Sequence, residues 1–195
     1  MWKPTFLESI KNIIEKYPKA GAYCTSFEIK KEDGTLISSN FSDFEENWQG
    51  VIDDYFKYAL KGSLISASSV VIPKNVFIDL GGFPLGIKRG EDLDMWIRIA
   101  LNHDIVYLNQ ICATYFHDAE NRACKKKSKL IDSSALYAEE LLTKVKELGN
   151  YSTYFEEYMI KRIITKSRYM IAEGNCKEAR KLLHKYKYTS FNKKF

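Results

Sequence analysis

Hydrophobic residues recur at helical spacing at the start of the chain and then give way to runs rich in β-forming side chains. Residues 4–17 predict an amphipathic helix, with Pro4 in its first turn and Pro18 after its end. The apolar face of this helix is expected to hold Leu7, Ile10, Ile13, Ile14 and Tyr17. Residues 20–30 predict a strand, and Glu32-Asp33-Gly34 predicts a turn into a return strand over 35–38.

The middle of the chain alternates between further strand and helix patterns. Residues 39–50 show no period and are interpreted as a loop, followed by a short helix over 51–61 and a buried strand over 65–72. A brief helix from Pro73 through Leu80 is closed by Gly81-Gly82, and residues 83–90 form a loop that ends in Gly90. The next two elements are a helix over 91–102 and a strand over 105–115. The helix is expected to turn Leu93, Trp96, Ile97, Ala100 and Leu101 to one face.

After residue 125 the pattern becomes wholly helical. Three helices are predicted there, separated by the helix-ending dipeptides Gly149-Asn150 and Gly174-Asn175. Residues 1–117 carry 12 Lys/Arg and 15 Asp/Glu, whereas residues 118–195 carry 18 and 10. The sequence therefore predicts an α/β part, residues 1–122, and a helical extension, residues 123–195.

Composition narrows the classes of protein that the chain can represent. A hydrophobic content of 45% and a charged content of 28% fit a globular protein. No apolar run approaches the roughly 20 residues that span a bilayer, and Met1-Trp2-Lys3-Pro4 lacks the apolar core of a signal peptide. The four cysteines are widely spaced, so they suggest thiols in a reducing cytoplasm rather than zinc ligands or disulfides. The basic residues follow no nucleic-acid-binding pattern, and no nucleic-acid partner is expected.

Two adjacent carboxylates, Glu91 and Asp92, open the helix predicted over 91–102. The dipole and free N–H groups of a helix N-terminus stabilise an ionised carboxylate. An ionised carboxylate beside a loop can accept a proton from a substrate hydroxyl. Acidic residues in a first helical turn are also common as caps, and the residue pattern alone leaves both interpretations open.

The string Gly81-Gly82-Phe83, a short loop, and then Gly-Glu-Asp-x-Asp-x-Trp-x-Arg over 90–98 resembles the acceptor-side signature of family 2 glycosyltransferases, which have the GT-A fold. The resemblance implies that Asp92 is the general base and Glu91 its partner. It also implies substrate-binding roles for a further set of residues: Gly82, Phe83, Gly90, Trp96 and Arg98. Trp96 and Arg98 have an alternative role in helix packing and surface charge. Pro73 departs from the family pattern, which commonly has a basic residue after the preceding strand; Lys74 follows it.

A second similarity lies at the start of the chain. Trp2-Lys3-Pro4-x-Phe-Leu-Glu resembles the segment just after the metal-binding Asp-x-Asp motif in this family, and no Asp-x-Asp precedes Trp2. The resemblance thus covers about residues 2–122, the second half of a catalytic domain. It implies inverting transfer of a sugar from a nucleoside diphosphate sugar to a hydroxyl acceptor, a saccharide or lipid-linked saccharide, in bacterial cell-surface polysaccharide or glycoconjugate synthesis. Mg²⁺ or Mn²⁺ would be required, with most of its ligands in the other half.

His117 ends the last predicted strand, where some relatives place a histidine on the metal or the diphosphate. A loop histidine without a ligand role is the alternative. Asp118 and Asn121 are similarly ambiguous. The basic run Lys125-Lys126-Lys127-Ser128-Lys129 suggests peripheral contact with anionic lipid at the inner face of the membrane, or simply a solvated helix start.

Two further hypotheses compete with an active enzyme. The polypeptide could be a catalytically silent, truncated or split subunit, whose exposed sheet edge favours self-association or pairing with the missing half. The helical extension could instead be an interaction module, in which case deleting residues 126–195 would abolish a partner complex and spare the sugar chemistry.

Overall fold

The computed structural model of the chain describes residues 1–117 and 128–187, which pack into two compact units. Residues 1–82 and 95–117 form the first unit, and residues 83–94 and 128–187 form the second. The segment 83–94, which the sequence division at residues 122 and 123 groups with the α/β part, thus packs with the helices. The predictions for Asp118, Asn121, Cys124 and Lys125–Lys127 lie outside the described residues.

A mixed five-stranded sheet is the centre of the first unit, which confirms the α/β class. Its strands are β1 (Ala22–Lys30), β2 (Leu36–Ser38), β3 (Gln49–Val51), β4 (Val70–Val71) and β5 (Ile105–Phe116). The order is β2-β1-β5-β3, with β4 beside β1. Strands β1 and β5 run parallel, and the other pairs are antiparallel.

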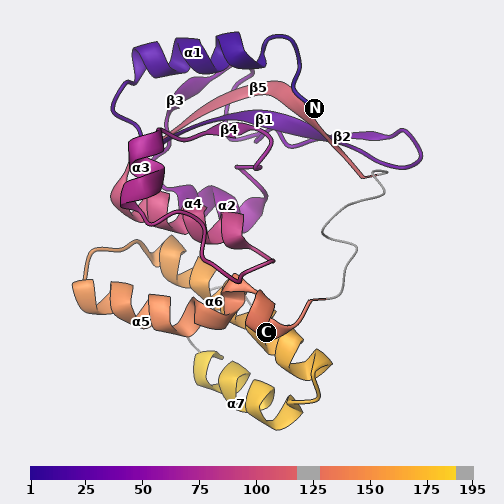
Figure 1. Cartoon of the computed structure of the whole chain (residues 1–195), viewed down its shortest axis with the longest axis vertical. Coiled ribbons are helices and arrows are strands. Elements are labelled where there is room, and N and C mark those ends of the chain that lie inside the picture. Colours follow the sequence, from indigo (N-terminus) through magenta and orange to yellow (C-terminus); the bar gives the residue numbers. More distant parts are fainter. Residues whose placement is uncertain (118–127, 188–195) are drawn as a thin grey trace. The chain divides into compact units, whose positions relative to one another are not determined.

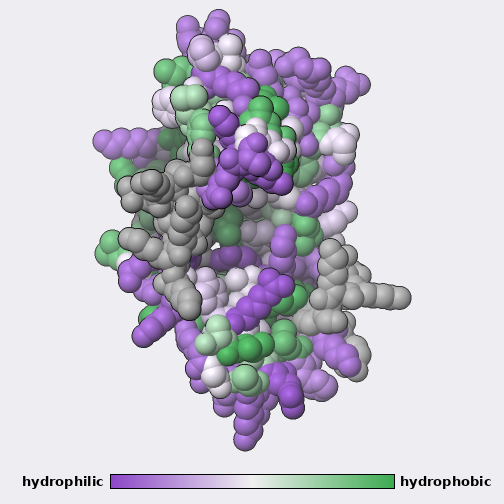
Figure 2. All heavy atoms as spheres, turned by 90° about the vertical axis from the view of Figure 1, so that its right-hand side faces the viewer, coloured by the Kyte–Doolittle hydropathy of each residue, from purple (hydrophilic) through white to green (hydrophobic). Residues whose placement is uncertain are grey.

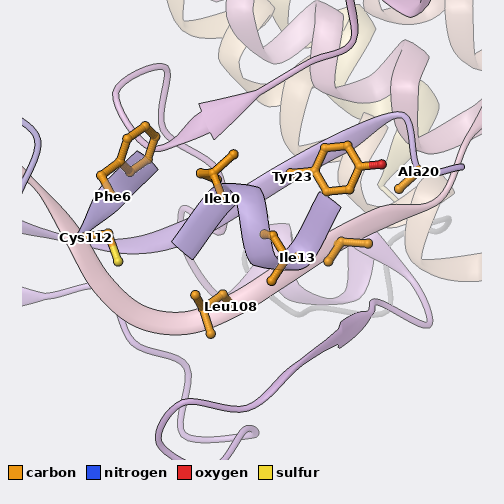
Figure 3. Packing of buried hydrophobic residues seen from close by; sticks show 8 residues of the cluster. Phe6, Ile10, Ile13, Ala20, Tyr23, Leu108 and Cys112 are labelled. Atoms are coloured by element: carbon orange, nitrogen blue, oxygen red, sulfur yellow. The ribbon is translucent and has the colours of Figure 1, made fainter. Parts of the chain in front are cut away.

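Helix α1 (Phe6–Lys16) covers one face of this sheet (Figure 1). Its buried residues Phe6, Ile10 and Ile13 pack on a cluster from the turn before β1, from β1 and from β5 (Figure 3). The cluster's strand-side members are Ala20, Tyr23, Val106, Leu108 and Cys112. The expected face was wrong in one residue: Leu7 is 61% exposed, because Phe6 starts the i, i+4, i+7 stripe and Leu7 lies a quarter-turn away.

The opposite face of the sheet is covered by helices of the segment between β3 and β5, as Figure 1 shows. They are α2 (Tyr55–Lys61), α3 (Lys74–Asp79) and the later turns of α4 (Glu91–Asn102). The start predicted for the 51–61 helix was too early, because Gln49–Val51 pairs with β5 and Asp54 caps the helix through the amides of Phe56 and Lys57.

Two other predictions differ from the structure. Only Val70–Val71 of the strand expected over 65–72 is extended, because Ser66 accepts hydrogen bonds from Ser68 and Ser69 in a local turn. The buried residues of α4 are Met95, Trp96, Ile97 and Ile99. Leu93, Ala100 and Leu101 are only partly buried, so the face expected for this helix was partly wrong.

The second unit contains the three helices that the sequence predicts. They are α5 (Ala138–Leu148), α6 (Thr153–Ala172) and α7 (Cys176–Tyr186), preceded by the 3₁₀ turns η2 (Leu130–Asp132) and η3 (Ser134–Tyr137). Gly149 ends α5 with a left-handed φ of 74°. The Glu139 carboxylate of α5 pairs with Lys166 of α6 at 3.0 Å and Lys185 of α7 at 3.3 Å, so one acidic group joins all three helices.

A buried amide fixes the loop between β2 and β3. Asn109 on β5 is 2% exposed, and its Nδ2 donates to the carbonyl oxygens of Phe44 and Glu45, each at 3.0 Å, and of Phe41 at 3.4 Å. Its Oδ1 accepts from Tyr107 Oη at 2.9 Å and Ser26 Oγ at 3.1 Å. Because both the nitrogen and the oxygen of the Asn109 amide are hydrogen-bonded, this side chain fixes the position of residues 41–45 against the sheet.

Hydrophilic side chains predominate on the face that Figure 2 shows. Within the described residues, no helix is both long enough and apolar enough to cross a membrane.

We expect Asn109→Leu to lower the free energy of unfolding by roughly 2–4 kcal/mol, because it leaves buried carbonyl and hydroxyl groups without partners. Urea unfolding followed by circular dichroism measures the change. Asn102→Leu is the control, since Asn102 is exposed and its side-chain amide donates to Arg98 O of its own helix. Equal effects of the two substitutions would contradict the role of Asn109.

The buried Tyr107 side chain makes the stability of the first unit decrease at alkaline pH. Burial raises the pKa of Tyr107 to about 12, against the opposing hydrogen bond with Ser26. The folded protein therefore keeps this proton above pH ~10, where an unfolded tyrosine loses it. The stabilisation is fully present below about pH 10 and disappears as pH rises through about 12.

We expect Tyr107→Phe to reduce the dependence of the unfolding free energy on pH in this window, by up to about 1.4 kcal/mol per pH unit. Urea titrations at several values of pH measure it. Tyr154→Phe, at a tyrosine that is 45% exposed, should leave the dependence as in the wild type, and the same result for Tyr107→Phe would refute the prediction.

Candidate functional site

Arg98 ties helix α4 to the diglycine turn. Its guanidinium donates from Nη1 to the carbonyl oxygen of Leu80 and from Nη2 to that of Gly82 at 2.7 Å. Gly81 and Gly82 have φ of 83° and 67°, a conformation that strains any residue with a side chain. The Gly-Gly and Arg positions of the motif are therefore structurally linked, because Arg98 holds the turn through hydrogen bonds to two of its carbonyl oxygens.

The loop over 83–90 belongs to the second unit. Its backbone bonds to the 3₁₀ turns: the amides of Lys88 and Arg89 donate to Asp132 O at 2.7 and 3.0 Å, and Ser134 N donates to Arg89 O at 2.9 Å. Lys88 Nζ also pairs with Asp132 Oδ1 at 2.8 Å. At the other end of the loop, Phe83 is 45% exposed and Leu85 is fully exposed.

Gly90 turns the chain into α4 with a φ of 70°, and its carbonyl accepts the first helical bond, from Asp94 N at 3.0 Å. Glu91 and Asp92 follow in the first turn and are half-buried. Asp92 Oδ1 accepts from Leu93 N at 2.7 Å. Within the described residues no lysine, arginine or histidine pairs with either carboxylate.

Helix α4 contributes to both units, since its first turn packs in the second and its remainder in the first. Trp96 is 2% exposed, so packing already accounts for its position in the motif. Its indole nitrogen has no hydrogen-bond partner within the described residues.

His117 stands directly after β5. Its amide donates to Lys30 O at 2.8 Å, and its ring meets the ring of Tyr115 edge-on, with centroids 5.5 Å apart. No group of three His, Cys, Asp or Glu side chains among residues 1–117 and 128–187 is arranged to hold a metal ion.

Part of the 39–50 loop lines a cleft of about 350 Å³ in the first unit. Phe27 and Phe41 line it together with several polar residues, which are Ser38, Ser39, Asn40, Ser42, Asp43, Lys61 and Ser63. Asp43 and Lys61 form an ion pair there.

Sequence reasoning missed the residues that hold the Gly90 turn. Ser134 Oγ donates to Gly90 O at 2.6 Å, and the Arg162 guanidinium donates to Ser134 Oγ. These partners lie 44 and 28 positions apart along the chain. A lone serine and a helical arginine at such separations carry no local pattern, so no sequence signal could have found them.

No protein-family model matches the chain, and a search of curated proteins found none that is significantly similar.

We expect Arg98→Lys to lower the free energy of unfolding by about 1.5–3 kcal/mol, because an ammonium cannot bond both carbonyls in the geometry of the guanidinium fork. Thermal unfolding followed by circular dichroism tests this. Arg180→Lys, on an exposed site of α7, is the matched control and should change stability by less than about 0.5 kcal/mol. If Arg98→Lys is as mild as the control, the two hydrogen bonds do not hold the diglycine turn.

Proposed function

We propose that the chain carries the acceptor-side part of an inverting, GT-A type family 2 glycosyltransferase. The observation that carries the proposal is the arrangement around α4: a glycine turn presents Glu91 and Asp92 in the first turn, unpaired within the described residues, and Arg98 of the same helix holds the Gly81-Gly82 turn. Packing explains the position of Trp96, and hydrogen bonds explain that of Arg98. The two adjacent half-buried carboxylates pair with no cationic side chain among residues 1–117 and 128–187.

In the proposed reaction, Asp92 acts as general base on the acceptor hydroxyl. The hydroxyl oxygen attacks the anomeric carbon as its proton passes to the Asp92 carboxylate. The bond from the anomeric carbon to the diphosphate oxygen breaks on the opposite side, and the nucleoside diphosphate leaves with the electron pair. Attack on one face and departure from the other invert the configuration at the anomeric carbon. Glu91, next to the base, would orient the acceptor.

The donor substrate is a nucleoside diphosphate sugar, and the acceptor is a saccharide or lipid-linked saccharide in cell-surface polysaccharide or glycoconjugate synthesis. A divalent cation, when bound, would stabilise charge on the leaving diphosphate. None of the steps assigned to this chain depends on the cation. A cytoplasmic location at the inner face of the membrane fits a lipid-linked acceptor.

The helical unit also bears on the choice between hypotheses. Residues 83–94 pack within it, so the motif's own loop and first turn are anchored by the helices. This favours a role for the helices in the same site over a separate interaction module. Deleting residues 126–195 should then impair the site as well as any partner complex.

Asp92→Asn should lower the turnover rate of sugar transfer by about 10²–10⁴-fold, since an amide cannot take the acceptor's proton. Release of nucleoside diphosphate from UDP- and GDP-sugars, with Mn²⁺ and a mixture of saccharide acceptors, measures transfer. Calorimetric titration with UDP and GDP should give the same affinity for wild type and variant, because Asp92 acts on the acceptor.

Asp104→Asn, at an exposed carboxylate just after α4, is the control and should transfer at the wild-type rate. Transfer that survives Asp92→Asn unchanged would refute the assignment of the base. No transfer and no nucleotide binding by the wild type would favour the catalytically silent subunit.

A further inference from the structure

A chain of hydrogen bonds runs from the helical core of the second unit to the start of α4. The Arg162 guanidinium donates to Ser134 Oγ, Ser134 Oγ donates to Gly90 O at 2.6 Å, and the same carbonyl accepts Asp94 N at 3.0 Å. Arg162 is 9% exposed and Ser134 is 6% exposed. A charged donor that polarises the hydroxyl strengthens its bond to the next acceptor, and burial strengthens the whole chain.

The approach of these groups to Gly90 is close. A Cβ atom on residue 90 would lie 2.7 Å from Ser134 Oγ and 3.2 Å from Arg162 Nη2. The φ of 70° independently disfavours a side chain there. Glycine at this position of the motif is thus explained by contact with the helical unit as well as by the turn itself.

The first turn of a helix usually frays, because its amides lack partners within the helix. Here the backbone bonds of Lys88 and Arg89 to Asp132 hold the preceding loop, and Ser134 holds the Gly90 carbonyl on which the first helical bond depends. Glu91 and Asp92 lie within that turn. Their positions are therefore set by groups from η2, η3 and α6.

We propose that Ser134 and Arg162 are positioning residues that fix the first turn of α4 and aim the Glu91–Asp92 pair. The proposal rests on the function proposed above for Asp92. General-base catalysis requires a carboxylate held within a fraction of an ångström of its productive position. Loss of either residue should therefore slow turnover while leaving substrate affinity nearly unchanged.

Amide hydrogen exchange of the full chain, measured by NMR, tests the positioning without relying on activity. Ser134→Ala and Arg162→Met should each speed exchange of the amide of Asp94 by about tenfold, because the Gly90 carbonyl loses its anchor. Arg162→Lys, which keeps a charged donor, should restore part of the protection. Ser167→Ala is the matched control: Ser167 is a buried serine of α6 that donates to Ile163 O, away from the loop.

Unchanged exchange at Asp94 in Ser134→Ala, or an equal effect of Ser167→Ala, would overturn the proposal. Should Arg162→Met fail to fold, Ser134→Ala decides alone, since it removes a single hydroxyl. Where the wild type transfers sugar, both variants should lower kcat about tenfold with KM within about twofold, and an effect on KM alone would also overturn it. A wild type without transfer would favour the catalytically silent subunit over an active enzyme and leave the exchange result to decide the positioning.

Discussion

The parallel pairing of β1 with β5 is the constraint on which the first unit depends. The two strands are separated by most of the unit's sequence, and a parallel pair needs a long crossover connection, which here contains β2, β3, β4, α2 and α3. The register shifts at Ser26, and there Ser26 meets Tyr107 and Asn109 of the partner strand. Asn109 in turn holds the loop over 41–45 through hydrogen bonds to three of its carbonyl oxygens. One buried polar cluster thus sets both the local register and the path of a loop that lines a cleft.

Helix α4 is held by polar contacts of the same kind near both of its ends. Arg98 bonds to the carbonyls of the diglycine turn in the first unit, and Gly90 is bonded by Ser134 in the second. Apolar packing of Met95, Trp96 and Ile99 stabilises the helix but tolerates small shifts, whereas hydrogen bonds to single carbonyl oxygens specify position. A helix that must present two carboxylates in a defined place benefits from anchors of this second type.

Local chemistry made much of the secondary structure predictable. Pro18 ended α1, Asp33-Gly34 formed the expected turn, and Gly149 closed α5, because each residue restricts its own backbone. The strand expected over 65–72 was wrong because serine hydroxyls close a local turn that competes with extension. The short strand β3 escaped prediction because its stability comes from pairing with β5, which no local pattern reveals.

The sequence by itself determined the α/β class, the three C-terminal helices and the motif with Glu91 and Asp92 at a helix start. Those features follow from periodicity and from residues that act on neighbours a few positions away. Only the tertiary structure decided that residues 83–94 pack with the helices and that Ser134 and Arg162 hold the Gly90 turn. It also decided that Arg98 serves the diglycine turn. These contacts join residues that are distant in sequence. They depend on how whole helices and strands pack in the folded chain, and not on the conformational preferences of individual residues.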